Sequence, residues 1–151
     1  MTYLLDTCVV SERMKSSPDQ NVLEWLSSVD EDSLYISAVT IGELRKGISL
    51  LGDTKRAAQL SRLLDLIESE YSDRILSYNI SVAEIWGETV ADAERLGFSR
   101  PVLDSLIAAT AKTDNMVLVT RNVSDMKHMG VAIVNPWENG KERNLHDDLQ
   151  T

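Results

Sequence analysis

Short apolar runs that alternate with amphipathic helices are the feature that most constrains the fold. The runs at residues 3–5, 34–36, 74–78, 116–119 and 131–134 have the length and composition of short strands. Between them, apolar residues recur at helical spacing over 21–29, 38–50, 54–71, 81–96 and 102–113. Parallel strands need long crossover connections, which helices commonly supply. We therefore predict an α/β fold with a mostly parallel sheet.

The length of 151 residues is that of one domain. Asp6 and Thr7 directly follow the first predicted strand, and no helix is predicted immediately after them. We predict a folded domain over residues 1–137. Residues 138–151 are polar and charged, and we interpret them as a loosely held C-terminal tail.

Charge and cysteine content limit the function classes. The formal net charge of -9 argues against a simple basic nucleic-acid clamp, but not against a nucleic-acid enzyme whose positive charge comes from metal ions. Cys8 is the one cysteine, so an intramolecular disulfide is impossible. No signal peptide or membrane-spanning run is recognisable. We therefore expect a soluble cytoplasmic protein.

Carboxylates lie where an α/β sheet binds its ligands, beyond the carboxyl ends of the strands. Asp6 follows the first strand, and Asp125 comes shortly after the strand at 116–119. Glu43 and Asp104 lie near the starts of two predicted helices. Four half-buried carboxylates at one edge would repel one another unless cations neutralise them or some are protonated. Their oxygens suit Mg²⁺ or Mn²⁺, and two such ions can promote phosphodiester hydrolysis.

Each acid also has a simpler interpretation, and the spacing alone does not decide between the two. In this simpler interpretation, Asp6 and Asp125 are cap or turn residues. Glu43 is a solvated helix residue, and the charge of Asp104 complements the dipole at a helix N-terminus.

Four blocks of sequence, in order, resemble the PIN-domain ribonucleases. The blocks are Leu4-Leu5-Asp6-Thr7, 36–44 (ISAVTIGEL), 104–111 (DSLIAATA) and Val119-Thr120-Arg121-Asn122. The closing Asn135-Pro136-Trp137 is similar to the branch of VapC-type and FitB-type toxins. The resemblance extends from about Leu4 to Trp137 and leaves out the polar tail.

The resemblance implies a three-layer α/β/α PIN-like domain and a metal-dependent endoribonuclease that hydrolyses RNA phosphodiester bonds. The implied metal ligands, for Mg²⁺ or Mn²⁺, are Asp6, Glu43 and Asp104, with Asp125 as the fourth. Thr120 would orient a water or an acid, and Asn122 would lie close by.

The resemblance also implies partners. The chain would be the toxin of a toxin–antitoxin pair, a homodimer that inhibits translation or growth. A cognate antitoxin would insert a segment into the acidic groove, and the complex would bind DNA through the antitoxin.

Two positions depart from the pattern of the family. Cys8 stands where many relatives have Asn, a change that we expect the turn to tolerate. Asn122 stands where some relatives have a fourth acid, so either Asn122 or Asp125 is left as the fourth ligand position.

Other chemistries fit the sequence less well. A metal-free ribonuclease would need two histidines as acid and base, and the two present are His128 and His146 in the tail. Neither histidine lies near Cys8 in the sequence, which disfavours a thiol nucleophile. The main alternative is a non-catalytic PIN-like module that binds RNA or protein.

Overall fold

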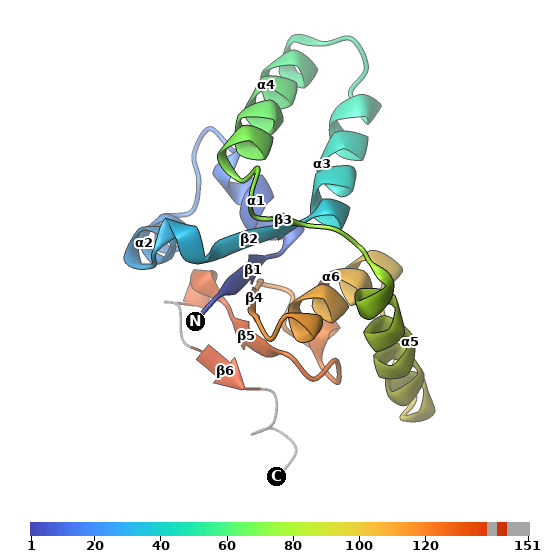
Figure 1. Cartoon of the computed structure of the whole chain (residues 1–151). Helices are drawn as coiled ribbons and strands as arrows, with labels where there is room; N and C mark the ends of the chain where they lie inside the picture. Colours follow the sequence, from blue (N-terminus) through green and yellow to red (C-terminus); the bar gives the residue numbers. More distant parts are fainter. Residues whose placement is uncertain (139–141, 145–151) are drawn as a thin grey trace.

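The structure is a computed structural model that describes residues 1–138 and 142–144 (Figure 1). The strands are β1 (Tyr3–Leu5), β2 (Leu34–Ser37), β3 (Ile75–Leu76), β4 (Val117–Val119), β5 (Ala132–Val134) and β6 (Glu142–Asn144). The α-helices are α1 (Thr7–Arg13), α2 (Gln20–Ser28), α3 (Ala38–Leu50), α4 (Lys55–Glu70), α5 (Ile80–Arg95) and α6 (Val102–Thr113). Short 3-10 helices are η1 (Glu31–Ser33), η2 (Ser124–Met126) and η3 (Pro136–Glu138).

The described strands form one sheet in the order β3-β2-β1-β4-β5-β6. Every neighbouring pair from β3 to β5 is parallel, and β6 alone runs antiparallel to β5 within the described sheet. In the central register, Leu4 lies between Tyr35 of β2 and Leu118 of β4. The prediction of an α/β fold with a mostly parallel sheet is confirmed.

Helices cover both faces of the sheet and create two apolar cores. Leu5 packs with residues of α1, α2, α3 and α4 on one face. The neighbouring Leu4 packs with residues of α6 on the other face, beside which α5 lies (Figure 1). Side chains alternate between the faces of a strand, so a strand that is covered on both sides is apolar at consecutive positions. This explains the unbroken apolar runs of β1 and β4 and gives the three-layer arrangement.

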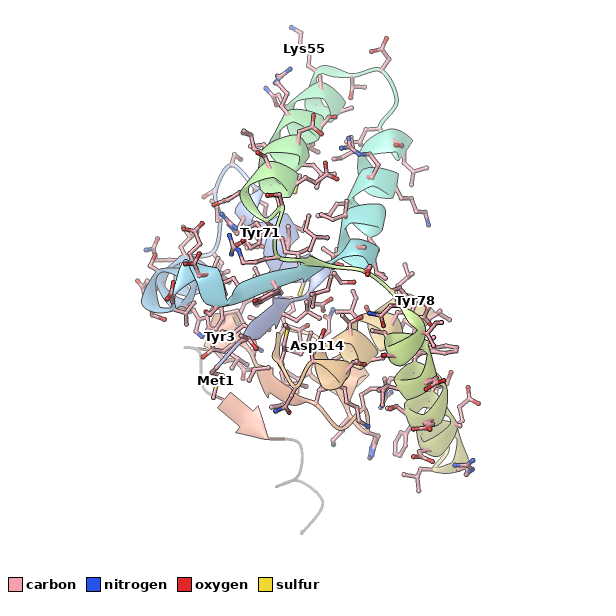
Figure 2. All side chains as sticks on the ribbon, in the orientation of Figure 1. Met1, Tyr3, Lys55, Tyr71, Tyr78 and Asp114 are labelled. Atoms are coloured by element: carbon pink, nitrogen blue, oxygen red, sulfur yellow. The ribbon has the colours of Figure 1, made fainter. Side chains whose placement is uncertain are left out.

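Helices α3 and α4 form an antiparallel hairpin that extends away from the sheet (Figure 1). Lys55 lies at its outer end and Tyr71 at its base (Figure 2). The Tyr71 side chain is fully buried, its hydroxyl accepts a 2.8 Å hydrogen bond from Arg13, and the Arg74 guanidinium lies 4.5 Å from the centre of its ring. These contacts fix the hairpin to the body of the domain.

Two elements differ from the sequence prediction. Helix α1 begins directly after Asp6, because the Asp6 side chain accepts the Thr7 N–H and Val9 and Val10 are buried. A helix of seven residues shows too little periodicity to be predicted from its apolar pattern. Within the segment interpreted as a tail, residues 142–144 pair with β5 as strand β6. Residues 139–141 and 145–151 lie outside the described residues, and the predicted domain boundary after Trp137 stays a prediction.

None of the helices in the described ranges has the length and apolar character needed to cross a membrane.

Candidate metal centre

The carboxyl ends of the central strands position the first acid. Asp6 comes directly after β1, and its backbone N–H donates to the carbonyl of Val119 at the end of β4 (2.9 Å). Its side chain is buried, with 1% exposed, and its Oδ1 accepts the Thr7 N–H at 2.8 Å as the N-cap of α1. The capping role that the sequence left open is therefore present, and it holds the carboxylate at the edge of the sheet.

Thr120 holds the other oxygen of Asp6. The Thr120 hydroxyl donates to Asp6 Oδ2 at 2.7 Å, and both side chains are buried. The hydroxyl in turn accepts the backbone N–H of Asn122 at 3.0 Å. The Thr120 N–H donates to the Val134 carbonyl, which anchors the residue to β5. The predicted residues Thr120 and Asn122 thus lie at this strand end, with Asn122 contributing its main chain.

Glu43 is positioned by a residue that the sequence prediction leaves out, Thr7. The Thr7 hydroxyl donates to Glu43 Oε1 at 2.9 Å and lies 3.1 Å from the hydroxyl of Thr40, one turn earlier on α3. The backbone N–H of Thr7 donates to Asp6 Oδ1, so Thr7 connects two of the predicted acids. A signal for this role is present in the sequence, where a hydroxyl residue directly follows the strand-end acid.

Asp104 and Asp125 complete the predicted set. Asp104 lies in the first turn of α6, and Asp125 lies in η2, shortly after β4. Burial, as the largest cause, and the charges of Asp6, Glu43 and Asp125 together raise the pKa of Asp104 to about 6. The charges of the other three predicted acids therefore all reach Asp104, although the four come from separate segments of the chain.

The pKa of Asp6 is also raised, mainly by burial and to a smaller extent by the charge of Asp125. The hydrogen bonds from Thr120, Thr7 and Cys8 oppose this rise because they stabilise the ionised carboxylate. Aligned donors therefore partly offset the cost of charge on this buried acid, while Asp125 adds to that cost.

This donor set suits a hard divalent cation. The ligands are carboxylate oxygens, and their mutual repulsion would fall when a cation binds among them. In residues 1–138 and 142–144, no three His, Cys, Asp or Glu side chains lie close enough together to form a ready-made cage. Mg²⁺ does not need one, since it commonly keeps several waters and binds through one or two carboxylates. The residues fit such an ion, and the metal site itself stays a prediction.

Cys8 lies at the site without the properties of a nucleophile. Its Sγ is 3.7 Å from Asp6 Oδ2 and 3.6 Å from the Thr120 hydroxyl. Burial and the nearby Asp6 charge raise the pKa of the Cys8 thiol to about 11. The sulfur is therefore a protonated thiol near neutral pH, whereas a cysteine nucleophile must be a thiolate.

A metal-free ribonuclease with histidines as acid and base gains no support from His128, because its ring stacks on Phe98 with 3.6 Å between ring centroids. His146 lies outside the described residues.

Comparison with known proteins identifies relatives along most of the chain. Residues 3–131 match the family model described as PIN domain. The chain is 36% identical over 135 residues to the toxin FitB of Neisseria gonorrhoeae, covering 89% of this chain and 97% of that protein. It is 33% identical over 136 residues to a VapC ribonuclease of Sinorhizobium fredii, covering 89% of this chain and 97% of that protein.

Among solved structures, FitAB bound to a DNA fragment contains a chain with a TM-score of 0.82 and 34% identity to this one. The match covers 90% of this chain and 96% of that chain. The likeness therefore extends over the whole α/β/α architecture, including the strand ends that carry the acids.

Proposed function

Because the chain belongs to the PIN-domain family, we propose that it is a metal-dependent endoribonuclease and the toxin of a toxin–antitoxin pair. The observation that carries the proposal is that Thr7 joins Asp6 and Glu43 by hydrogen bonds at the sheet edge, where the charges of both, with that of Asp125, help to raise the pKa of Asp104 to about 6. Acids that destabilise one another in this way are suited to binding a cation.

The ion would be Mg²⁺ or Mn²⁺, held by Asp6, Glu43, Asp104 and Asp125. When bound, it would supply an activated water and stabilise the charge on the leaving oxygen during RNA hydrolysis.

The protein's own groups prepare the site before substrate arrives. Thr120 and the Thr7 N–H fix the two oxygens of Asp6, at 2.7 and 2.8 Å. The Thr7 hydroxyl fixes Glu43. Asp104 has a raised pKa of about 6. Without a cation it is therefore partly protonated near neutral pH, so metal binding and proton release from Asp104 are expected to be linked.

An antitoxin is the proposed protein partner, since the relative FitB is named a toxin and FitAB is seen bound to DNA. A cavity of about 410 Å³ supports this proposal. It lies between α1, α3 and α4, and Glu43 lines it together with apolar residues such as Met14, Leu44 and Leu60. Lys15 and Arg56 also line the cavity, so an antitoxin segment with an apolar side chain and a polar or acidic neighbour would match this lining. We propose that the complex binds DNA through the antitoxin.

A homodimer is the proposed assembly. Tyr78, Ile80, Val102 and Leu103 are large apolar residues that remain exposed around the starts of α5 and α6. Such a face is suited to burial against a second copy. The cytoplasm, which holds the RNA substrate and keeps Cys8 reduced, is the proposed location.

The test is cleavage of total cellular RNA by antitoxin-free protein with Mg²⁺, with Mn²⁺ and with chelator. Discrete fragments that require metal, and that Asp104→Asn does not produce, are the expected result. Asp53→Asn is the matched control, because Asp53 is exposed in the loop between α3 and α4. Folded wild-type protein that cleaves no RNA with either metal would favour the non-catalytic binding module instead.

A further inference from the structure

Arg121 differs from most arginines of the described chain in what it contacts. Arg13, Arg45, Arg74, Arg95 and Arg100 all donate hydrogen bonds to oxygen acceptors. The Arg121 guanidinium instead lies over the ring of Trp137, with 4.3 Å between its central carbon and the ring centroid. Within residues 1–138 and 142–144, it forms no ion pair and no side-chain hydrogen bond.

Trp137 is itself held in place. Its backbone N–H donates a 3.1 Å hydrogen bond to Asn135 Oδ1. Its carbonyl accepts a 3.2 Å hydrogen bond from the Asn21 side chain on α2. The ring is half-buried and packs against the core on the α1–α4 face. The aromatic surface under Arg121 is therefore a fixed platform, which reduces the entropy that the long arginine side chain would lose on binding.

The backbone of Arg121 lies next to the acidic site. Arg121 directly follows Thr120, whose hydroxyl contacts Asp6 at 2.7 Å. The positive charge of Arg121 also acts on Glu12, whose pKa is lowered mainly by the hydrogen bond from Lys15 and least by Arg121. Glu12 is already paired, at 2.6 Å from Lys15 and 2.9 Å from the Asp19 N–H. The Arg121 side chain is exposed, so its N–H donors face solvent.

We propose that Arg121 binds a phosphate of the RNA strand next to the acidic site, and that Trp137 positions its guanidinium for this contact. The inference rests on the proposed ribonuclease function and names a substrate-binding residue for it. A chain of net charge -9 repels RNA, so a cation held beside the acidic site would add to the charge of a bound metal ion in drawing the strand in. The planar guanidinium matches phosphate geometry, and stacking on the ring leaves its hydrogen-bonding edge open.

The test compares RNA binding by variants that do not cleave. Arg121→Gln and Arg121→Lys are made in the Asp104→Asn background with Mg²⁺ present, and the probe is a short fluorescein-labelled single-stranded RNA. Its dissociation constant is measured by anisotropy between about 50 and 200 mM salt. The matched control is Arg95→Gln, which removes the same charge from the exposed end of α5.

Arg121→Gln is expected to raise the dissociation constant roughly fivefold to tenfold, as for loss of one charge-assisted hydrogen bond. It is also expected to reduce the slope of log K against log salt by about 0.7, the value for one phosphate contact on a single strand. Arg121→Lys should keep the salt slope but bind more weakly, because lysine lacks the planar group that stacks on Trp137. Arg95→Gln should leave both quantities close to those of the background protein.

A purely structural role for Arg121 would change the melting temperature but not the salt slope. An unchanged slope in folded Arg121→Gln therefore overturns the phosphate contact. If the Asp104→Asn background binds no RNA at low salt and wild type cleaves none, the proposed ribonuclease function fails as well. If wild type cleaves RNA while Arg121→Gln binds as tightly as the background, only the role of Arg121 is refuted.

Discussion

Removing the charge of Asp104 should stabilise the metal-free protein, although Asp104 is a proposed catalytic ligand. The folded state raises the pKa of Asp104 from 3.8 to about 6, through burial and the charges of Asp6, Glu43 and Asp125. Because the folded state holds the proton more tightly, the ionised carboxylate destabilises the fold as pH rises through this window. The full penalty applies above about pH 6, and it disappears below about pH 3.8.

The size of the effect follows from the shift. A change from 3.8 to about 6 corresponds to about 3 kcal/mol at full strength. Asp104 is only partly buried, so solvent screening reduces this to roughly half. Asp104 also lies in the first turn of α6, where a carboxylate gains about 0.5 kcal/mol from the helix dipole. Asp104→Asn is therefore expected to stabilise the metal-free protein by about 1 kcal/mol near neutral pH.

The assay is urea unfolding of wild type and Asp104→Asn in chelator, at about pH 7.5 and about pH 4. The variant should be more stable at the higher pH and equal to or slightly less stable than wild type at the lower pH. Asp53→Asn, in an exposed loop, should show no comparable pH-dependent difference. A variant that is less stable than wild type at pH 7.5, or a difference that does not change with pH, would refute the strained acidic cluster.

Three further predictions concern groups around the site and the hairpin. Thr120→Val should lower the free energy of unfolding by about 1–3 kcal/mol in urea titrations, because buried Asp6 loses its 2.7 Å donor, whereas Thr120→Ser should retain most of the stability. Equal losses in the two variants would contradict the role of the hydroxyl. Leu64→Ala, at a fully buried position of α4, should lower the free energy of unfolding by about 2–5 kcal/mol. Leu66→Ala changes a residue that is 66% exposed on the same helix and should lower it far less. Similar losses in the two variants would contradict the described packing. Cys8, with a pKa of about 11, should react with iodoacetamide much more slowly in native protein than in urea-unfolded protein, and equal rates would show an accessible thiolate.

The alternation of apolar runs and amphipathic helices was sufficient to predict the architecture. Helices over 38–50 and 102–113 were predicted with the bounds that α3 and α6 have in the structure. Their caps are visible in the sequence, Ser37 before α3 and Pro101 before α6. Helix α1 was missed because one residue, Asp6, acts both as a strand-end acid and as an N-cap, and seven residues carry little periodicity. Strand β6 was missed because its residues, Glu142 to Asn144, are polar and its pairing with β5 is a tertiary contact.

The candidate site was only partly accessible from the sequence. Strand topology explains why Asp6 and Asp125 were predicted near one edge of the sheet. The spacing did not decide whether Glu43 and Asp104 reach that edge, and their selection depended on the family resemblance. The connection made by Thr7 between Asp6 and Glu43 depends on how α1 packs against α3, which no local pattern encodes. The stacking of Arg121 on Trp137 likewise joins residues that are distant in the chain.

The most direct test of the central claim, that four acids form one cation site, is calorimetric titration of Mn²⁺ into metal-free protein. Wild type and the control Asp53→Asn should bind Mn²⁺ with the same affinity, and binding should release a fraction of a proton near pH 6, where Asp104 titrates. Asp104→Asn should bind at least roughly tenfold more weakly and release no such proton, because one charged ligand is lost. Equal Mn²⁺ affinity in wild type and Asp104→Asn, or no binding by folded wild type, would contradict the account.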